Sequence, residues 1–147
     1  MQNLDFPQPE PQLYEIPDEV LHSLSKSVLI LEDDSAFADL LKQTLEEQDY
    51  RVTIVADGAK GVQQIIAADF DAILCDMVMP NFPGDMFYLA VQRARPHLCP
   101  RFVFMTGHQN DPKIAKFIEQ SGCVALWKPF QMRDLFAALE TLASRSK

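Results

Sequence analysis

The sequence predicts an α/β domain with a doubly wound parallel sheet of five strands, in the order 2-1-3-4-5, and five helices. Two observations predict this class. Five short apolar runs alternate along the chain with five segments whose apolar residues recur at helical spacing. The runs are also apolar at nearly every position, which is typical of parallel strands that helices cover on both faces. Right-handed crossovers between such strands give a three-layer sandwich of helices, sheet and helices.

The predicted strands are apolar segments that end at a turn residue or a polar residue. They are Val28–Leu31, Arg51–Ala56, Asp71–Asp76, Arg101–Thr106 and Cys123–Trp127. The predicted helices follow them in turn; each has residues that recur three or four positions apart, at helical spacing, and those of the fourth helix face inward. These residues are Phe37, Leu40, Leu41, Thr44 and Leu45 in the first helix, Val62, Ile65 and Ile66 in the second, Phe87, Ala90, Val91 and Ala94 in the third, Ile114, Phe117 and Ile118 in the fourth, and Leu135, Leu139 and Leu142 in the last.

Capping and turn residues support these boundaries. Asp34 or Ser35 suits the N-cap of the first helix, because a short polar side chain can accept a hydrogen bond from the first turn. Asp57-Gly58 turns the chain before the second helix. Pro112 fits the first turn of the fourth helix, and Gly122 follows its end, as a glycine commonly does.

Residues 1–27 differ from the rest of the chain. We expect a Pro-rich, acidic tail or linker there, followed by one folded domain over residues 28–147. Ile16, Val20, Leu21 and Leu24 fall on one face of a short helix that Pro17 would begin. That helix would be a docking segment; a frayed linker is the interpretation we favour.

Composition narrows the class of protein. A chain of 147 residues with 48% hydrophobic content suits a single domain with a sizeable core. No apolar run approaches the roughly 20 residues that a membrane span needs, and the N-terminal stretch does not resemble a secretory signal. A net charge of -8 argues against sequence-independent binding to nucleic acid or to an anionic membrane. We therefore expect a cytoplasmic protein, with Cys75, Cys99 and Cys123 as reduced thiols.

Acidic side chains follow two strands that the predicted order makes neighbours. Glu32 and Asp33 leave the first strand, and Asp76 ends the third. Three carboxylates this close must take up protons or bind a cation. Mg²⁺ suits the site, because it prefers oxygen ligands and usually takes one or two protein carboxylates. Asp76 alone would more commonly cap the following helix, but capping does not account for the converging set.

Two further polar residues end the remaining strands at the same edge of the sheet. Thr106 ends the fourth strand and Lys128 follows the fifth. Alone, the threonine would be a cap or turn residue and the lysine a solvated charge. Together with the acids they place a hydroxyl and an ammonium group over a nucleophilic carboxylate. Such a set can receive a phosphoryl group.

These residues carry a resemblance to a known family. From Val28 to the C-terminus the chain resembles the receiver domain of two-component response regulators. The matching motifs are Leu31-Glu32-Asp33-Asp34, Asp76-Met77-Val78-Met79-Pro80 with Gly84, Thr106-Gly107, and Lys128-Pro129-Phe130. Each motif is short and weak alone. Four of them in the right order, at the ends of the right strands, are specific.

The resemblance implies that Asp76 accepts a phosphoryl group from a phosphohistidine on a sensor histidine kinase or phosphotransfer protein. It also implies that Mg²⁺ is bound directly by Asp33, Asp76 and the backbone carbonyl of Val78, with Glu32 acting through water. Such a phosphoprotein is a signalling domain and not an enzyme, beyond catalysing its own phosphorylation and dephosphorylation.

The resemblance further implies that Thr106 bonds a phosphoryl oxygen, that Lys128 pairs with the same group, and that the Lys128-Pro129 peptide is cis. The chain departs from the family at Ala125, where receivers commonly carry a Tyr or Phe that couples to the threonine. Trp127 follows on the same side of the strand. We interpret Trp127 as a packing residue and leave open whether it replaces the missing ring.

Phosphorylation would change the surface of the fourth helix, fifth strand and fifth helix, which would bind a downstream protein or a second copy of the domain. The chain is then either a stand-alone receiver or a fragment of a longer regulator or hybrid histidine kinase.

Three other classes of protein match parts of this sequence pattern. A phosphorylation-independent interaction module is favoured by Ala125, but the joint presence of Asp33, Asp76, Thr106 and Lys128 argues against it. A flavodoxin-like nucleotide or flavin binder shares the predicted fold, but it needs a phosphate loop where this chain has three acids. An aspartate-nucleophile phosphatase would carry a second aspartate two positions after the first, and Met77-Val78 offers none.

Overall fold

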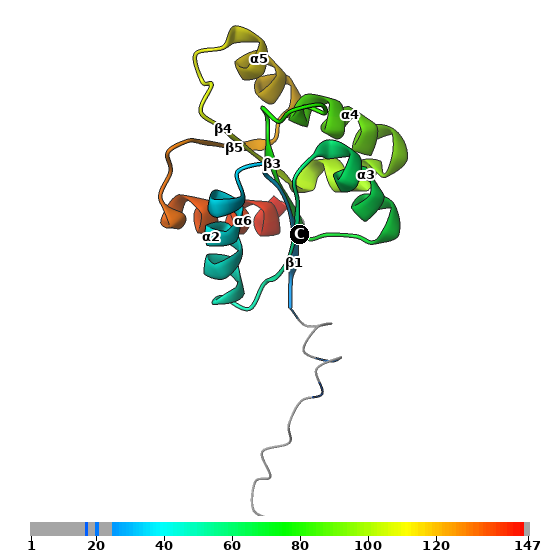
Figure 1. Cartoon of the computed structure of the whole chain (residues 1–147), viewed down its shortest axis with the longest axis vertical. Coiled ribbons are helices and arrows are strands. Elements are labelled where there is room, and N and C mark those ends of the chain that lie inside the picture. Colours follow the sequence, from blue (N-terminus) through cyan, green and yellow to red (C-terminus); the bar gives the residue numbers. More distant parts are fainter. Residues whose placement is uncertain (1–16, 18–19, 21–24, 146–147) are drawn as a thin grey trace, which may run out of the picture.

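A computed structural model describes residue 17, residue 20 and residues 25–145 of the chain. The predicted tail and its short helix lie outside these residues, apart from Pro17 and Val20. Figure 1 shows the described domain as a set of helices arranged around a central sheet.

The sheet has five parallel strands in the order β2-β1-β3-β4-β5, which confirms the predicted topology. The strands are β1 (Ser27–Leu31), β2 (Arg51–Val55), β3 (Ala72–Asp76), β4 (Phe102–Thr106) and β5 (Val124–Trp127). The helices are α2 (Ser35–Glu46), α3 (Gly58–Ala67), α4 (Gly84–Ala94), α5 (Pro112–Ser121) and α6 (Met132–Arg145). Each predicted strand lies within one residue of its observed bounds.

One element was not predicted. The 3₁₀ helix η1 (Pro96–Arg101) connects α4 to β4 and buries Leu98 and Cys99. Its six residues are too few to show a helical period in the sequence. No helix within the described part of the chain is long and apolar enough to cross a membrane.

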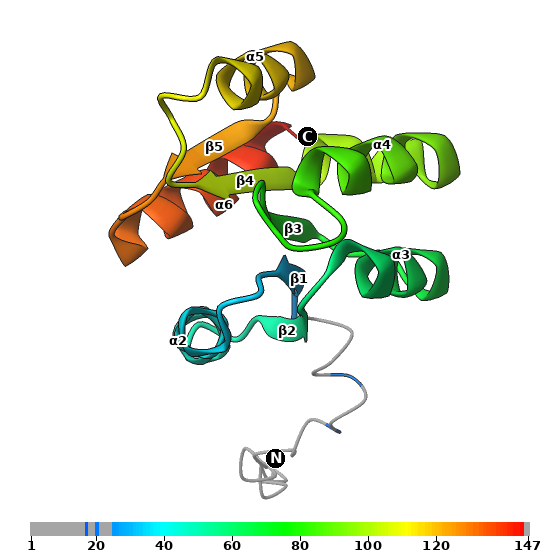
Figure 2. The ribbon, with the colours of Figure 1, turned by 45° about the horizontal axis from the view of Figure 1, so that its top comes forward.

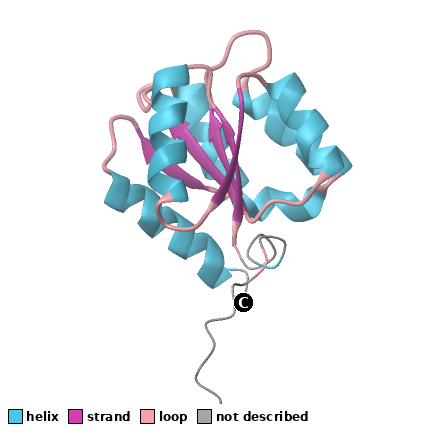
Figure 3. Cartoon of the chain, turned by 60° about the horizontal axis from the view of Figure 1, so that its bottom comes forward, coloured by secondary structure: helices cyan, strands magenta, loops and turns pink. Residues whose placement is uncertain are grey.

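Helices cover both faces of the sheet (Figures 2 and 3). Alternate residues of the central strands point to opposite layers, because successive side chains of a strand do so. One layer packs α3, α4 and α5 against strand residues Leu29, Leu31, Ile73, Cys75, Phe102 and Phe104. The other packs α2 and α6 against Val28, Ile30, Leu74, Val103 and Met105. The two layers fix the strand ends from both sides.

Strand register determines which residues meet at the carboxyl edge of the sheet. Leu31 of β1 pairs with Cys75 of β3, so the residues that follow them leave the sheet side by side. Asp76 pairs with Met105 of β4, immediately before Thr106. Thr106 in turn pairs with Trp127 of β5, immediately before Lys128. The strand pairing therefore accounts directly for the predicted convergence of these polar residues.

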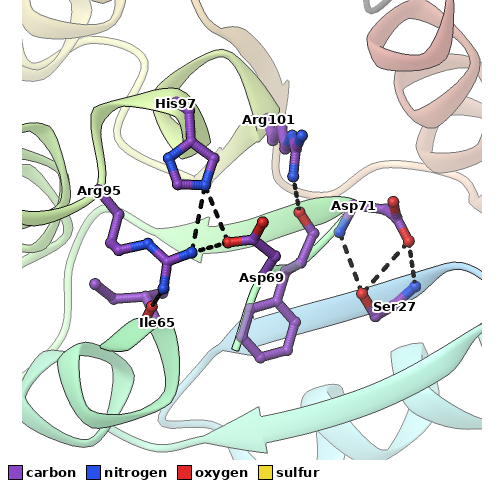
Figure 4. Close-up of polar contacts among 8 residues, drawn as sticks. Ser27, Ile65, Asp69, Asp71, Arg95, His97 and Arg101 are labelled. Atoms are coloured by element: carbon purple, nitrogen blue, oxygen red, sulfur yellow. Dashed lines mark hydrogen bonds and ion pairs between the residues drawn. The ribbon is translucent and has the colours of Figure 1, made fainter. Parts of the chain in front are cut away.

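Polar contacts fix the opposite edge of the sheet (Figure 4). The Ser27 backbone N–H donates to Oδ2 of Asp71 at 2.8 Å, which joins the starts of β1 and β3. Arg95 forms an ion pair with Asp69 and donates to a carbonyl of α3. These contacts hold the N-terminal ends of the strands while the loops at the other edge carry the acidic residues.

Candidate functional site

Three carboxylates meet at the carboxyl edge of the sheet. One oxygen from each of Glu32, Asp33 and Asp76 lies within 4.8 Å of the others. Glu32 and Asp76 are buried, whereas Asp33 is exposed. The structure thus brings together the acids that the sequence predicted to converge.

Lys128 reaches into this acidic cluster from the end of β5. Its Nζ donates to Oε1 of Glu32 at 2.6 Å and to Oδ2 of Asp76 at 3.1 Å. Burial by itself lowers the pKa of Lys128, but the hydrogen bonds and charges of the two acids outweigh it and raise the pKa above its usual value. The lysine is therefore a charged counter-ion shared by two buried acids.

Both carboxylate oxygens of Asp76 have partners. Oδ2 accepts from Lys128, and Oδ1 accepts from the backbone N–H of Val78 at 3.0 Å. Gly84 lies close behind: a Cβ there would collide with the carbonyl oxygen of Asp76. The loop after β3 is thus packed against the backbone of the residue whose side chain it orients.

Glu32 is the residue whose surroundings fit a cation. It is only 2% exposed, and its Oε2 is buried with no hydrogen-bond partner among the described residues. Burial, with the neighbouring Asp76 carboxyl group, raises the pKa of Glu32 to about 8, against the opposing effect of Lys128. Buried oxygen atoms without partners are uncommon in proteins. One ammonium facing three acids leaves oxygen ligands available for a hard divalent ion.

Thr106 is fully buried at the end of β4. Its Oγ1 accepts from the backbone N–H of His108 at 3.0 Å, so the hydroxyl keeps its own hydrogen for donation. Its carbonyl accepts from the backbone N–H of Lys128 at 2.8 Å. The strand pairing therefore couples the positions of the predicted hydroxyl and ammonium groups.

Two aromatic rings and a proline border the charged groups, and the sequence does not predict this. A cavity of about 510 Å³ is lined by the acids and Lys128 and also by Phe37, Pro129 and Phe130. The sequence places Phe37 only in the apolar repeat of the first helix. Its place in the turn directly after the acidic pair was the available signal, but nothing in the sequence relates it to the distant lysine.

Ala125, where receivers commonly carry a Tyr or Phe, is partly buried in the domain. Ala125 pairs in register with Phe104 of β4 and packs against the α3–α5 layer of the core. The centroid of the Phe104 ring lies 5.7 Å from that of Tyr88 and 5.8 Å from that of Phe117. The aromatic ring next to Ala125 in this layer is therefore that of Phe104, on the adjacent strand β4. Trp127 is 37% exposed. The Lys128-Pro129 peptide is cis, as the resemblance implied.

Comparison with known proteins places the chain in a family. The model of the response regulator receiver domain matches residues 28–140. This chain belongs to the response regulator receiver family, whose members are signalling domains of two-component systems.

Curated relatives agree with this membership. Transcription factor SKN7 of Candida albicans is 31% identical over 112 residues, which cover 76% of this chain and 20% of that protein. The response regulator receiver protein CpdR of Brucella abortus is 28% identical, over 80% of this chain and 96% of that protein. The chain spans between a fifth and about half the length of the first relatives it matches.

Solved structures show the same fold. The CheY-like receiver domain protein from Methanospirillum hungatei has a TM-score of 0.75 at 28% identity, covering 83% of this chain and 97% of that one. The receiver domain of sensor histidine kinase PA1611 from Pseudomonas aeruginosa has a TM-score of 0.72 at 24% identity, covering 80% and 97%. That structure has a magnesium ion coordinated in its active site cleft.

Proposed function

We propose that Asp76 accepts a phosphoryl group from a phosphohistidine of a histidine kinase or phosphotransfer protein. A carboxylate oxygen of Asp76 attacks phosphorus, an O–P bond forms, and the N–P bond of the donor breaks with its electron pair leaving on the imidazole nitrogen. The observation that carries the proposal is the position of the Asp76 carboxylate, 3.1 Å from the Lys128 ammonium inside the acidic cluster.

Lys128 and Thr106 have supporting roles in this proposal. The ammonium group is already held over the acceptor and would pair with a phosphoryl oxygen. Thr106 retains a hydroxyl hydrogen and would donate it to the same group. Preorganised donors of this kind lower the barrier by stabilising charge that develops on the phosphoryl oxygens.

We further propose that Asp33, Asp76 and the backbone carbonyl of Val78 hold Mg²⁺, with Glu32 acting through water. The unsatisfied Oε2 of Glu32 and the three converging carboxylates support this assignment, as does the ion in the PA1611 receiver. Bound Mg²⁺ would neutralise charge between the acceptor and the incoming phosphoryl group.

Intact-mass spectrometry tests the acceptor directly. The protein is incubated with acetyl phosphate and Mg²⁺, and the mass should increase by one phosphoryl group. Asp76→Asn should show no increase, whereas Asp39→Asn, which changes an exposed aspartate of α2, should behave as wild type. A phosphorylated Asp76→Asn protein would contradict the proposal. So would a wild type that remains unmodified while the Mg²⁺ titration shows binding.

The fluorescence of Trp127 tests the metal assignment. The indole precedes Lys128, and it is the only tryptophan in the sequence. Mg²⁺ should change its emission, and Asp33→Asn should weaken the response strongly. An unchanged affinity in Asp33→Asn would show that the ion binds elsewhere.

The readout of phosphorylation is proposed to be the surface of α5, β5 and α6, which would bind a downstream protein or a second copy of the domain. We also propose that residues 28–147 form the folded unit in the cytoplasm and that residues 1–27 are a linker. A chain lacking residues 1–24 should retain the unfolding free energy of the full chain, and a large loss would contradict that boundary.

A further inference from the structure

The ring of Phe37 lies beside the ammonium group that Lys128 extends over the acidic cluster. Lys128 Nζ is 4.9 Å from the ring centroid, within the distance of about 6 Å at which an aromatic face attracts a cation. The same nitrogen donates to Glu32 and Asp76. With two of its three N–H groups bound to carboxylates, the ammonium gains a third attractive partner from the ring.

The position of the Phe37 ring is fixed by its backbone and by a second ring. The Phe37 backbone N–H donates to Oδ1 of Asp34 at 3.1 Å, the N-cap bond of α2. The ring packs edge-on against Phe130, with centroids 5.8 Å apart and planes at 76°. Phe130 follows Lys128 by two residues. Phe37 and Phe130, the two rings that line the cavity, therefore both belong to segments that also carry site residues.

A lysine side chain is flexible and its ammonium group is strongly hydrated. The Lys128 side chain is about one quarter exposed, at 26%, so water has access to it. An aromatic face on one side restricts the orientations in which the ammonium can turn to solvent. It does so without adding a charge that would compete for the carboxylates or for a metal ion.

We propose that Phe37 is a positioning residue for phosphoryl transfer: its ring holds the Lys128 ammonium over Asp76, where the incoming phosphoryl oxygen must be met. This inference rests on the proposed function. Its effect should appear in the rate constant of phosphorylation at saturating Mg²⁺, where a change in the competition between the lysine and the ion no longer affects the rate.

Phe37→Leu tests the proposal, because leucine keeps an apolar side chain at the position but has no aromatic face. Phosphorylation by acetyl phosphate at saturating Mg²⁺ should slow by about 3- to 30-fold. Mg²⁺ should still bind, because the substitution removes none of the proposed metal ligands. Phe37→Tyr should restore the wild-type rate, because it restores the ring. The small donor has no protein surface, so the measurement excludes an effect on partner docking.

Phe136→Leu is the matched control. Phe136 is half-buried and packs against the same core layer from α6, so its truncation should cost stability without changing the rate. Urea unfolding shows whether each variant is folded, and Phe37→Met serves if leucine is not tolerated.

Nuclear magnetic resonance checks the contact between the ring and the lysine on which the inference rests. Ring current from Phe37 should shift the side-chain CH₂ signals of Lys128, and the shift should disappear in Phe37→Leu and persist in Phe37→Tyr. A folded Phe37→Leu protein that is phosphorylated at the wild-type rate overturns the inference alone. A wild type that accepts no phosphoryl group overturns the proposed function and the inference with it.

Discussion

The ammonium nitrogen of Lys128 lies closer to Oε1 of Glu32, at 2.6 Å, than to Oδ2 of Asp76, at 3.1 Å. The lysine thus pairs with the buried Glu32 as well as with Asp76, the proposed phosphoryl acceptor. A divalent ion that enters the acidic cluster would face this ammonium across the same carboxylates. The two cations should therefore oppose each other.

Replacing the lysine should strengthen metal binding. In Lys128→Met we expect Mg²⁺ to bind at least about fivefold more tightly, because a positive charge a few ångströms from the ion has been removed. Trp127 fluorescence measures the affinity. Lys113→Met, which changes an exposed lysine of α5, is the control and should leave the affinity unchanged. Weaker binding in Lys128→Met would show that the lysine organises the metal ligands.

The pKa of Glu32 predicts how stability depends on pH without metal. Its folded-state pKa of about 8 lies above the ordinary value of 4.5, so the folded protein binds the proton more tightly than the unfolded chain. The resulting stabilisation is fully present below pH 4.5 and is lost as the pH rises toward 8. Between these limits the unfolding free energy should fall by up to about 1.4 kcal/mol per pH unit.

Urea unfolding at several pH values checks this dependence. Glu32→Gln cannot titrate and should flatten the curve in that window. Mg²⁺ should also flatten it, because the ion favours the ionised carboxylate. A wild-type curve that rises with pH between 5 and 8 would contradict the raised pKa.

Gly84 should not tolerate a side chain. A Cβ there would collide with the backbone of Asp76 and Met77, which cannot move aside as a flexible side chain would. Gly84→Ala should therefore destabilise the domain by about 2 kcal/mol or more. Gly107→Ala is the matched control, because its Cβ would meet Lys128 only at 3.9 Å, an ordinary contact. Equal stability of the two variants would refute the close packing of this loop.

His108 and Val78 should control how readily water reaches a phosphorylated Asp76. His108 follows Thr106 by two residues, and the Val78 side chain is 45% exposed. We expect His108→Ala and Val78→Asn to change the half-life of the phosphorylated protein several-fold. The His108 backbone N–H still bonds Thr106 in the alanine variant, so the effect would report the side chain alone.

The decay of the phosphorylated mass measures these half-lives. His97→Ala is the control, because His97 lies at the opposite edge of the sheet beside Asp69 (Figure 4). Half-lives equal to that of wild type in both site variants would end the hypothesis.

The residues that the sequence located correctly are those fixed by periodicity and topology. Strand ends follow from apolar runs, and the order of the strands makes Glu32 and Asp76 neighbours before any side chain is placed. The contact of Phe37 with Lys128 and the burial of Glu32 Oε2 without a partner were not predictable in this way. They depend on side-chain orientation between elements far apart in the sequence. The exposure of Trp127 likewise depends on how the edge strand β5 is covered, about which residue spacing says nothing.

The start of β1 and the end of α6 lie near one another, since Lys26, Asp71, Leu142 and Ala143 line a common pocket. Asp71 precedes β3, whereas Asp76 ends it, so this pocket is at the far end of the sheet from the carboxylates. A fluorophore attached at residue 26 or residue 143 would therefore lie at the end of the sheet opposite the carboxylates. The proposed phosphorylation site would stay open to a donor.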